Sequence, residues 1–108
     1  MSVNPADGSV LATFEALTPE ETVDRVRRAH EAWLAYRGTS FAERAGWLSA
    51  AADLLEAEAD EISATMTAEM GKTRVSAAAE ARKCASGMRF YVEHAEAFLA
   101  DVPGDTDA

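Results

Sequence analysis

Alanine is the residue that most limits what this chain can fold into. It accounts for 24 of the 108 residues, whereas leucine, isoleucine, valine and phenylalanine together account for only 19. A buried methyl group removes little apolar surface from water, but alanine is the strongest helix former. The composition therefore predicts helices around a thin core, near the limit at which so charged a chain folds alone, or helices whose apolar faces pack on a partner.

The charge and the single cysteine restrict the class of protein. The formal net charge is -9 at pH 7, which argues against a nucleic-acid partner. No apolar stretch approaches the roughly 20 residues of a membrane span, and residues 1–7 lack the basic and apolar regions of a signal peptide. Cys84 has no second cysteine to pair with and fits a reducing compartment. We therefore expect a cytoplasmic chain that forms at most one small domain.

Turn and capping signals divide the chain into a hairpin and helices. Asn4–Gly8 has turn composition, and 10–14 has strand composition. Thr18–Glu21 and Ser40–Glu43 are capping boxes, and Thr73 can cap a final helix.

Glycines at 38 and 71 are expected helix stops, and Pro103 cannot continue a helix. We therefore predict a mainly α fold, with a short N-terminal β-hairpin and three to four amphipathic helices. The predicted ranges are a hairpin at 3–15, helices at 18–37, 40–57, 58–70 and 73–101, of which the middle two are separate or one bent helix, and a tail at 102–108.

Apolar side chains at helical spacing predict which helix faces are buried. On the last helix the predicted face consists of Val75, Cys84, Met88, Tyr91, Val92, Ala95, Phe98 and Leu99. Other predicted core positions are Trp33, Trp47, Met66 and Met70, with His30 at the border of the core. Because the core is thin, an interface with a partner is the alternative for these side chains.

No thiol, histidine or carboxylate is arranged for catalysis. Cys84 would need a nearby base or cation, and Arg82 and Lys83 lie on other sides of the helix, so we expect a buried structural thiol. His30 and His94 lack a metal-ligand spacing, and His94 is expected on a solvated face. The same is expected of Asp53, Glu56 and Asp60, in place of a pair across a cleft.

The glycines and arginines likewise favour structural roles. The six glycines are too far apart to form a phosphate loop. A small basic cluster predicts ordinary helix ion pairs: Arg25, Arg27 and Arg28 against Asp24 and Glu31. We expect no catalytic, cofactor-binding or metal-binding residue in this chain.

Several short stretches also occur in an order known from one enzyme superfamily. The most telling are Glu69-Met70-Gly71-Lys72 and Arg-Phe-Tyr-Val-Glu-His-Ala-Glu at 89–96; the others are 3–8, 18–21, 40–44 and 51–56. Together they resemble the N-terminal segment of the NAD(P)-dependent aldehyde dehydrogenase superfamily over almost the whole chain. The two most telling stretches look most like succinate-semialdehyde dehydrogenases.

The resemblance implies the chemistry of a complete enzyme. A cysteine thiolate attacks the aldehyde carbon, the thiohemiacetal passes hydride to NAD or NADP, and a glutamate activates the water that releases the carboxylic acid. In the family, the residues for these steps and the cofactor-binding glycines follow the segment seen here, and Cys84 does not match the nucleophile. The implied partners are the remainder of the subunit, a small aldehyde substrate and further subunits of a homo-oligomer.

The resemblance also implies a role for the chain itself. Residues 1–108 would be the N-terminal part of a cofactor-binding domain without the catalytic domain, inactive alone and binding no cofactor. Glu69 falls near a position that holds a monovalent cation in some relatives, and Lys83–Tyr91 resembles a helix at the mouth of the substrate tunnel. The alternative is a free-standing helical interaction module without enzymatic activity, which would bury Trp33, Trp47 and Tyr91 against a partner.

Overall fold

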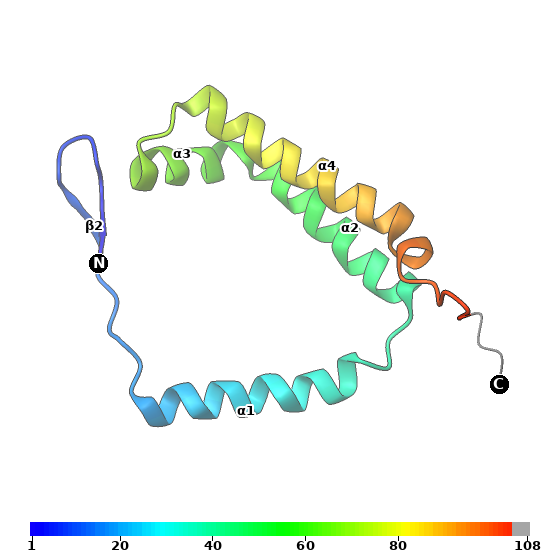
Figure 1. The fold of residues 1–108 in the computed structure, drawn as a ribbon. Helices are drawn as coiled ribbons and strands as arrows, with labels where there is room; N and C mark the ends of the chain where they lie inside the picture. The colour runs from blue at the N-terminus through cyan, green and yellow to red at the C-terminus, as the bar shows by residue number, and fades with distance from the viewer. Residues whose placement is uncertain (105–108) are drawn as a thin grey trace.

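The computed structural model describes residues 1–104, which form two strands and four helices (Figure 1). The elements are β1 (Ser2–Val3), β2 (Val10–Ala12), α1 (Pro19–Tyr36), α2 (Phe41–Ala57), α3 (Ala59–Met70) and α4 (Arg74–Phe98). The prediction of a mainly α chain with a short N-terminal hairpin is confirmed, and residues 40–70 form two helices. Of the predicted tail, residues 105–108 lie outside the described part.

The hairpin is small and rests on α3. Its strands pair antiparallel, with Ser2 opposite Ala12. The turn is closed by hydrogen bonds from the Asn4 N–H to the Ser9 carbonyl and from the Gly8 N–H to the Asn4 carbonyl, both 2.8 Å long. The Ser2 hydroxyl donates to the Glu69 carboxylate of α3 over 2.7 Å. A single hairpin is marginally stable in water, and α3 supplies the neighbour that this one contacts.

Side-chain caps begin three of the helices. Thr18 and Ser40 form complete capping boxes with Glu21 and Glu43, and Thr73 accepts a hydrogen bond from the Ser76 N–H. These hydroxyls satisfy N–H groups that have no partner inside the helix. The three predicted helix starts are therefore confirmed.

The two predicted glycine stops differ in outcome. Gly71 ends α3 in the left-handed conformation, with φ of 69°. The predicted stop at Arg37-Gly38 is confirmed, because Arg37 is the C-cap of α1, but Arg37 is right-handed and Gly38 is not among the glycines with positive φ. The guanidinium of Arg44 donates to the carbonyls of Tyr36 and Arg37 over 3.3 Å each. Because a side chain satisfies these carbonyls, the helix end does not need a left-handed residue.

The core is a seam of small side chains where α2 and α3 pack against α4 (Figure 1). The buried residues are Ala52, Ala59, Ser63, Ala77, Ala81 and Ala85. The three alanines of α4 are four residues apart, so they form one line along that helix. Small side chains bury little apolar surface between the helices. The thin core that the composition predicts is therefore confirmed.

The predicted apolar face of α4 is partly wrong. Met88, Val92 and Ala95 are half-buried, but Val75, Cys84, Tyr91, Phe98 and Leu99 are exposed. The packing follows the alanine line, and at about 100° per residue Cys84 is turned about 60° away from Ala81. Large apolar side chains therefore flank the seam instead of filling it.

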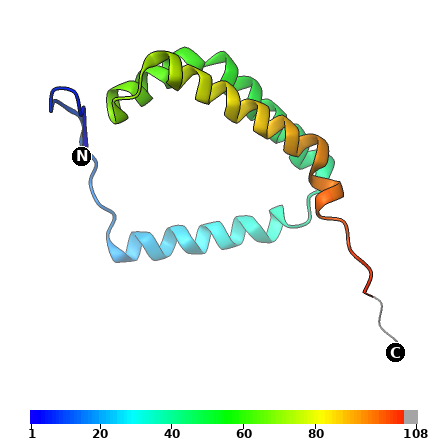
Figure 2. The same ribbon diagram turned by 45° about the horizontal axis from the view of Figure 1, so that its top comes forward.

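Helix α1 stands apart from the other helices in both views (Figures 1 and 2). None of its residues is buried, so the core positions predicted for His30 and Trp33 are wrong. Trp47 and Met70 are also exposed, while Met66 is half-buried. The exposure of the large side chains agrees with the alternative of an interface for these positions.

Candidate functional site

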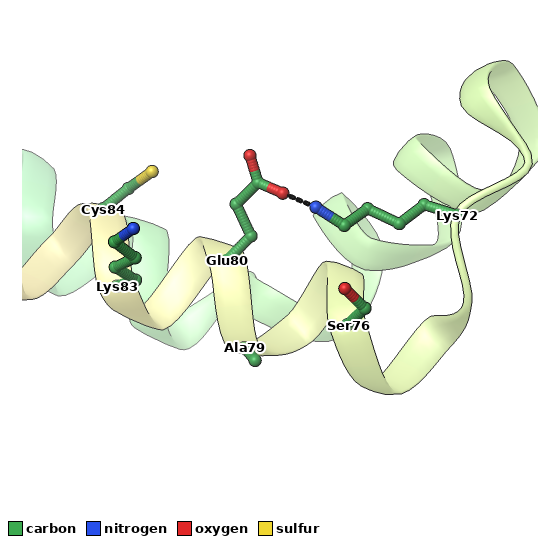
Figure 3. A pocket seen from close by; sticks show the side chains of 6 residues that line it. All are labelled: Lys72, Ser76, Ala79, Glu80, Lys83 and Cys84. Carbon is green, nitrogen blue, oxygen red and sulfur yellow. Dashed lines mark ion pairs between the residues drawn. The ribbon is translucent and has the colours of Figure 1, made fainter.

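The outer side of α4 carries a shallow pocket near its N-terminal end (Figure 3). It is lined by Lys72, Ser76, Ala79, Glu80, Lys83 and Cys84. The Lys72 ammonium forms an ion pair with the Glu80 carboxylate. Cys84 lies one turn after Glu80 and is exposed, so the expectation of a buried thiol is wrong.

The surroundings of Cys84 do not form a nucleophilic centre. Activation of a thiol requires a base that takes its proton or a cation that stabilises the thiolate. Lys83, which was expected on another side of the helix, lines the pocket together with Cys84, but no hydrogen bond joins the two side chains in the described residues. No histidine lines the pocket, and the Glu80 carboxylate is already paired with Lys72. The pocket therefore offers an accessible thiol beside an ion pair.

A second polar cluster joins α2 to α4. The Arg89 guanidinium donates to both oxygens of Glu56, over 2.8 and 2.9 Å, and to the Asp53 carboxylate over 2.7 Å. The hydrogen bonds that the guanidinium donates, first those to Glu56 and then that to Asp53, raise the pKa of Arg89. Asp53 and Glu56 are exposed as expected, but they bind a cation of another helix instead of water alone.

Asp60 does not belong to this cluster through its side chain. Its backbone carbonyl accepts hydrogen bonds from the Ser63 hydroxyl and from the Arg74 guanidinium. The three carboxylates singled out in the sequence are thus not brought together. Asp53 and Glu56 lie on one helix and share the Arg89 guanidinium, so these carboxylates do not form the facing pair of a glycosidase.

An apolar groove runs between the start of α2 and the end of α4. Its lining includes Phe41, Leu48, Val92 and Leu99, with Arg44 and Glu96 among its polar members. Next to it, the rings of Phe90, His94 and Phe98 follow one another along α4, with 4.4 Å between the centroids of Phe90 and His94. His94 is therefore half-buried beside two aromatic rings, where a solvated helix face was expected.

The described residues offer no constellation for a metal or a dinucleotide. No group of three or more histidine, cysteine, aspartate or glutamate side chains in residues 1–104 is placed to hold a metal ion. Glu69, the candidate cation ligand, accepts the Ser2 hydroxyl. The positive-φ glycines, Gly8 and Gly71, lie in a hairpin turn and at a helix end, and neither is in the strand-to-helix loop that cradles phosphates.

Within the part of the chain that the structure describes, no helix is long and apolar enough to cross a membrane.

The predicted ion pairs of the basic cluster are confirmed for Arg27, which binds Asp24 and Glu31 over 2.6 Å each.

Sequence patterns missed the arginines that join different helices, among them Arg89 and Arg44. Arg89 binds residues more than thirty positions away, and a spacing rule cannot reveal such a partner. Arg44 lies one residue after the Ser40 capping box, and it donates to Thr39 over 2.8 Å as well as to the end of α1. The sequence feature that could have indicated this role of Arg44 was its position just after a short link between two predicted helices.

Comparison with known proteins gives a consistent result over the whole chain. The model of the aldehyde dehydrogenase family matches residues 1–106. A succinate-semialdehyde dehydrogenase [NADP(+)] of Mycobacterium tuberculosis is 56% identical over 104 residues, which are 96% of this chain and 23% of the relative. The chain thus spans less than a quarter of the length of such curated relatives.

Solved structures agree with this match. A structure of the protein Gox0499 superposes with a TM-score of 0.92 at 31% identity, over 99% of this chain and 24% of that one. Succinic semialdehyde dehydrogenase from Streptococcus pyogenes, solved in complex with NADP+, gives a TM-score of 0.89 at 31% identity, over 98% and 24% of the two chains. The open arrangement of the four helices therefore also occurs within longer chains.

Proposed function

Because this chain belongs to the aldehyde dehydrogenase family, we propose that it is the N-terminal part of an enzyme that oxidises succinate semialdehyde to succinate with NADP+. The observation that carries the proposal is the 56% identity to a succinate-semialdehyde dehydrogenase [NADP(+)]. In the reaction, water supplies the oxygen of the new carboxylate and the aldehyde hydrogen leaves as hydride to the nicotinamide.

The proposed role of residues 1–108 in that enzyme is structural. They would form the outer helices and hairpin of the cofactor-binding domain. The accessible thiol of Cys84 has no histidine in its pocket, and the Glu80 carboxylate there is paired with Lys72. The described residues also lack a phosphate-binding loop, so they do not fit the cofactor. The nucleophile, the base and the dinucleotide site would therefore all belong to the rest of the subunit.

The composition supports this assignment. A core of five alanines and one serine leaves the large apolar side chains free to pack on another body. The single cysteine supports a cytoplasmic location for the enzyme. A homo-oligomer is part of the proposal as a property of the complete subunit.

The test begins with the coding sequence beyond the codon for Ala108. We expect the frame to continue into a glycine-rich cofactor segment and a second cysteine. The expressed full-length protein should oxidise succinate semialdehyde faster with NADP+ than with NAD+, and faster than it oxidises butanal, which lacks the carboxylate. The isolated 108 residues should show no turnover.

A free-standing interaction module is the competing function. The exposure of Trp33 and Trp47, at 48% and 53%, is compatible with it. A stop codon directly after Ala108 in well-covered sequence, together with a cooperative unfolding transition of the isolated chain, would favour the module and contradict the enzyme.

A further inference from the structure

The link between α1 and α2 is a short elbow, residues 37–40, that one side chain spans. Arg44 is half-buried near the start of α2, and its Nε donates to the Thr39 hydroxyl over 2.8 Å. A terminal nitrogen of the same guanidinium donates to the Tyr36 and Arg37 carbonyls over 3.3 Å each. The Thr39 hydroxyl donates in turn to the Tyr36 carbonyl over 2.8 Å. Arg44 therefore joins the last turn of α1 to the elbow and to α2.

The contacts of Arg44 fix its direction as well as its distance from α1. In residues 1–104, its acceptors are hydroxyl and carbonyl oxygens of the elbow and of the end of α1. The last carbonyls of a helix carry partial negative charge, which favours a cation at this place. The planar guanidinium reaches several acceptors at once, and it lies over the Tyr36 ring, 4.8 Å from its centroid. Such a set of contacts resists bending between the two helices.

The remainder of α1 does little to set its angle to α2. None of its residues is buried, and the helix runs apart from the other helices in both views (Figures 1 and 2). The segment before it, residues 13–18, contains neither helix nor strand. At the elbow, the Tyr36 ring also meets the Trp47 ring of α2, with 5.8 Å between the centroids. The angle between α1 and α2 therefore depends on the contacts at the elbow.

Gly38 gives the elbow a backbone freedom that the folded chain does not use. It is not among the glycines with positive φ, and a Cβ at this position would lie 3.8 Å from the Ala35 carbonyl oxygen, an ordinary contact. An alanine would therefore fit. Glycine has the widest range of backbone conformations, and hinges are a few loop residues that absorb changes in φ and ψ. The elbow can therefore bend at Gly38 when the contacts of Arg44 are lost.

We propose that residues 37–40 are a hinge and that Arg44 is the latch that holds α1 at its angle to α2. With the latch closed, α1 moves together with α2 as one body. With the latch open, α1 swings about Gly38 while both helices stay folded. This inference goes beyond the proposed function and does not depend on it, because all its contacts lie within residues 1–104. The competing determinant of the angle is the contact between the rings of Tyr36 and Trp47.

Distance measurements between two spin labels test the latch in the 108-residue chain. With Cys84→Ala as the background, Arg25→Cys on α1 and Ala50→Cys on α2 place the labels at exposed positions. In this parent, double electron–electron resonance should give one narrow distance distribution. Arg44→Ala should make the distribution at least about twice as wide at unchanged helicity, because the hinge residues are no longer held. Arg44→Lys keeps the charge but loses the fork, so its width should lie between the two.

Three further variants locate the hinge and the latch. Arg27→Ala is the matched control, because the ion pairs of Arg27 lie within α1, and it should leave the width unchanged. Trp47→Ala removes the ring contact and should widen the distribution less than Arg44→Ala does. Gly38→Ala, added to Arg44→Ala, should narrow the distribution again, since alanine restricts the backbone of the elbow.

The outcomes that contradict the latch are equally specific. A parent distribution as wide as that of Arg44→Ala, or a larger widening by Trp47→Ala, would overturn the proposal. No narrowing by Gly38→Ala would overturn the hinge at this residue. If Arg44→Ala loses helicity, Thr39→Val decides, because it removes the hydroxyl that the guanidinium binds and leaves the arginine in place. Widening of the distribution by Thr39→Val at the parent helicity would support the latch, and the parent width would overturn it.

Discussion

Arg89 on α4 and Glu56 on α2 form a bidentate ion pair, with N–O distances of 2.8 and 2.9 Å. The planar guanidinium matches the two carboxylate oxygens, which fixes the direction as well as the distance of the contact. Both side chains are partly exposed, so the pair is screened by solvent. Its main effect is to fix the alignment of α2 and α4, because the small side chains of the seam interlock little.

Removal of this pair should weaken the alignment of α2 and α4 only slightly. We expect Arg89→Ala to lower the thermal midpoint of the chain, and Arg89→Lys to lower it less, because lysine keeps the charge but loses the fork. In about 1 M NaCl the difference between Arg89→Lys and the parent should shrink, since salt screens exposed charges. Arg82→Ala, also exposed on α4, is the control. An equal shift for Arg82→Ala would show that the ion pair is irrelevant.

The alanine seam should tolerate no larger side chain. Ala81 is 3% exposed, and Ala81→Leu would force α4 away from α2 and α3. We expect a loss of about 1–3 kcal/mol in the free energy of unfolding, measured by urea denaturation followed by circular dichroism. Ala79→Leu, on the exposed side of the same helix, should change it by less than about 0.5 kcal/mol. Equal losses for both variants would mean that the seam is not the core.

Local signals predicted the elements of this fold well. Thr18, Ser40 and Thr73 act within one turn of themselves, so their chemistry is readable from adjacent residues. The core was harder to predict, because the apolar pattern of α4 gave weight to Tyr91 and Phe98 and little to alanines. The helices pack through their small side chains, and the larger apolar side chains are left exposed in residues 1–104.

The candidate site shows the same division. The ion pairs of Arg27 lie within four residues and were predicted. The partners of Arg89 and Arg44 depend on how separate helices meet, which no spacing within one helix encodes. Cys84 is exposed because it is turned about 60° away from Ala81 in the seam, and only the packed structure reveals which line of α4 is buried.

The capping box at Ser40 should make stability depend on pH. Hydrogen bonds from the Ser40 backbone N–H and then from its hydroxyl lower the pKa of Glu43. A carboxyl whose pKa is lower when folded stabilises the fold above its unfolded pKa, about 4.3, and this contribution is lost as the pH falls through the folded pKa. Glu43→Gln should therefore lower the thermal midpoint at pH 6, and the difference from the parent should narrow as the pH falls below about 4.3.

Glu15→Gln is the control for this pH dependence, because no hydrogen bond to the Glu15 carboxylate is present in the described residues. It should leave the pH profile close to that of the parent. If the thermal midpoints of Glu43→Gln and the parent differed by the same amount from pH 6 down to pH 3, the capping box would not be the source of the pH dependence.

Cys84 should behave as an accessible thiol without a catalytic role. Because it is exposed on the outer side of α4, an aromatic disulfide reagent should modify it in the folded chain at a rate within about ten-fold of that in urea, since local opening is not needed. Cys84→Ala should abolish the modification and leave the helicity and the unfolding midpoint unchanged. In a chimera in which residues 1–104 replace the matching segment of the Mycobacterium tuberculosis relative, Cys84→Ala should keep the oxidation of succinate semialdehyde, because the proposed nucleophile is a different cysteine. A loss of turnover in that variant, with its circular dichroism spectrum unchanged, would show that this thiol takes part in the chemistry.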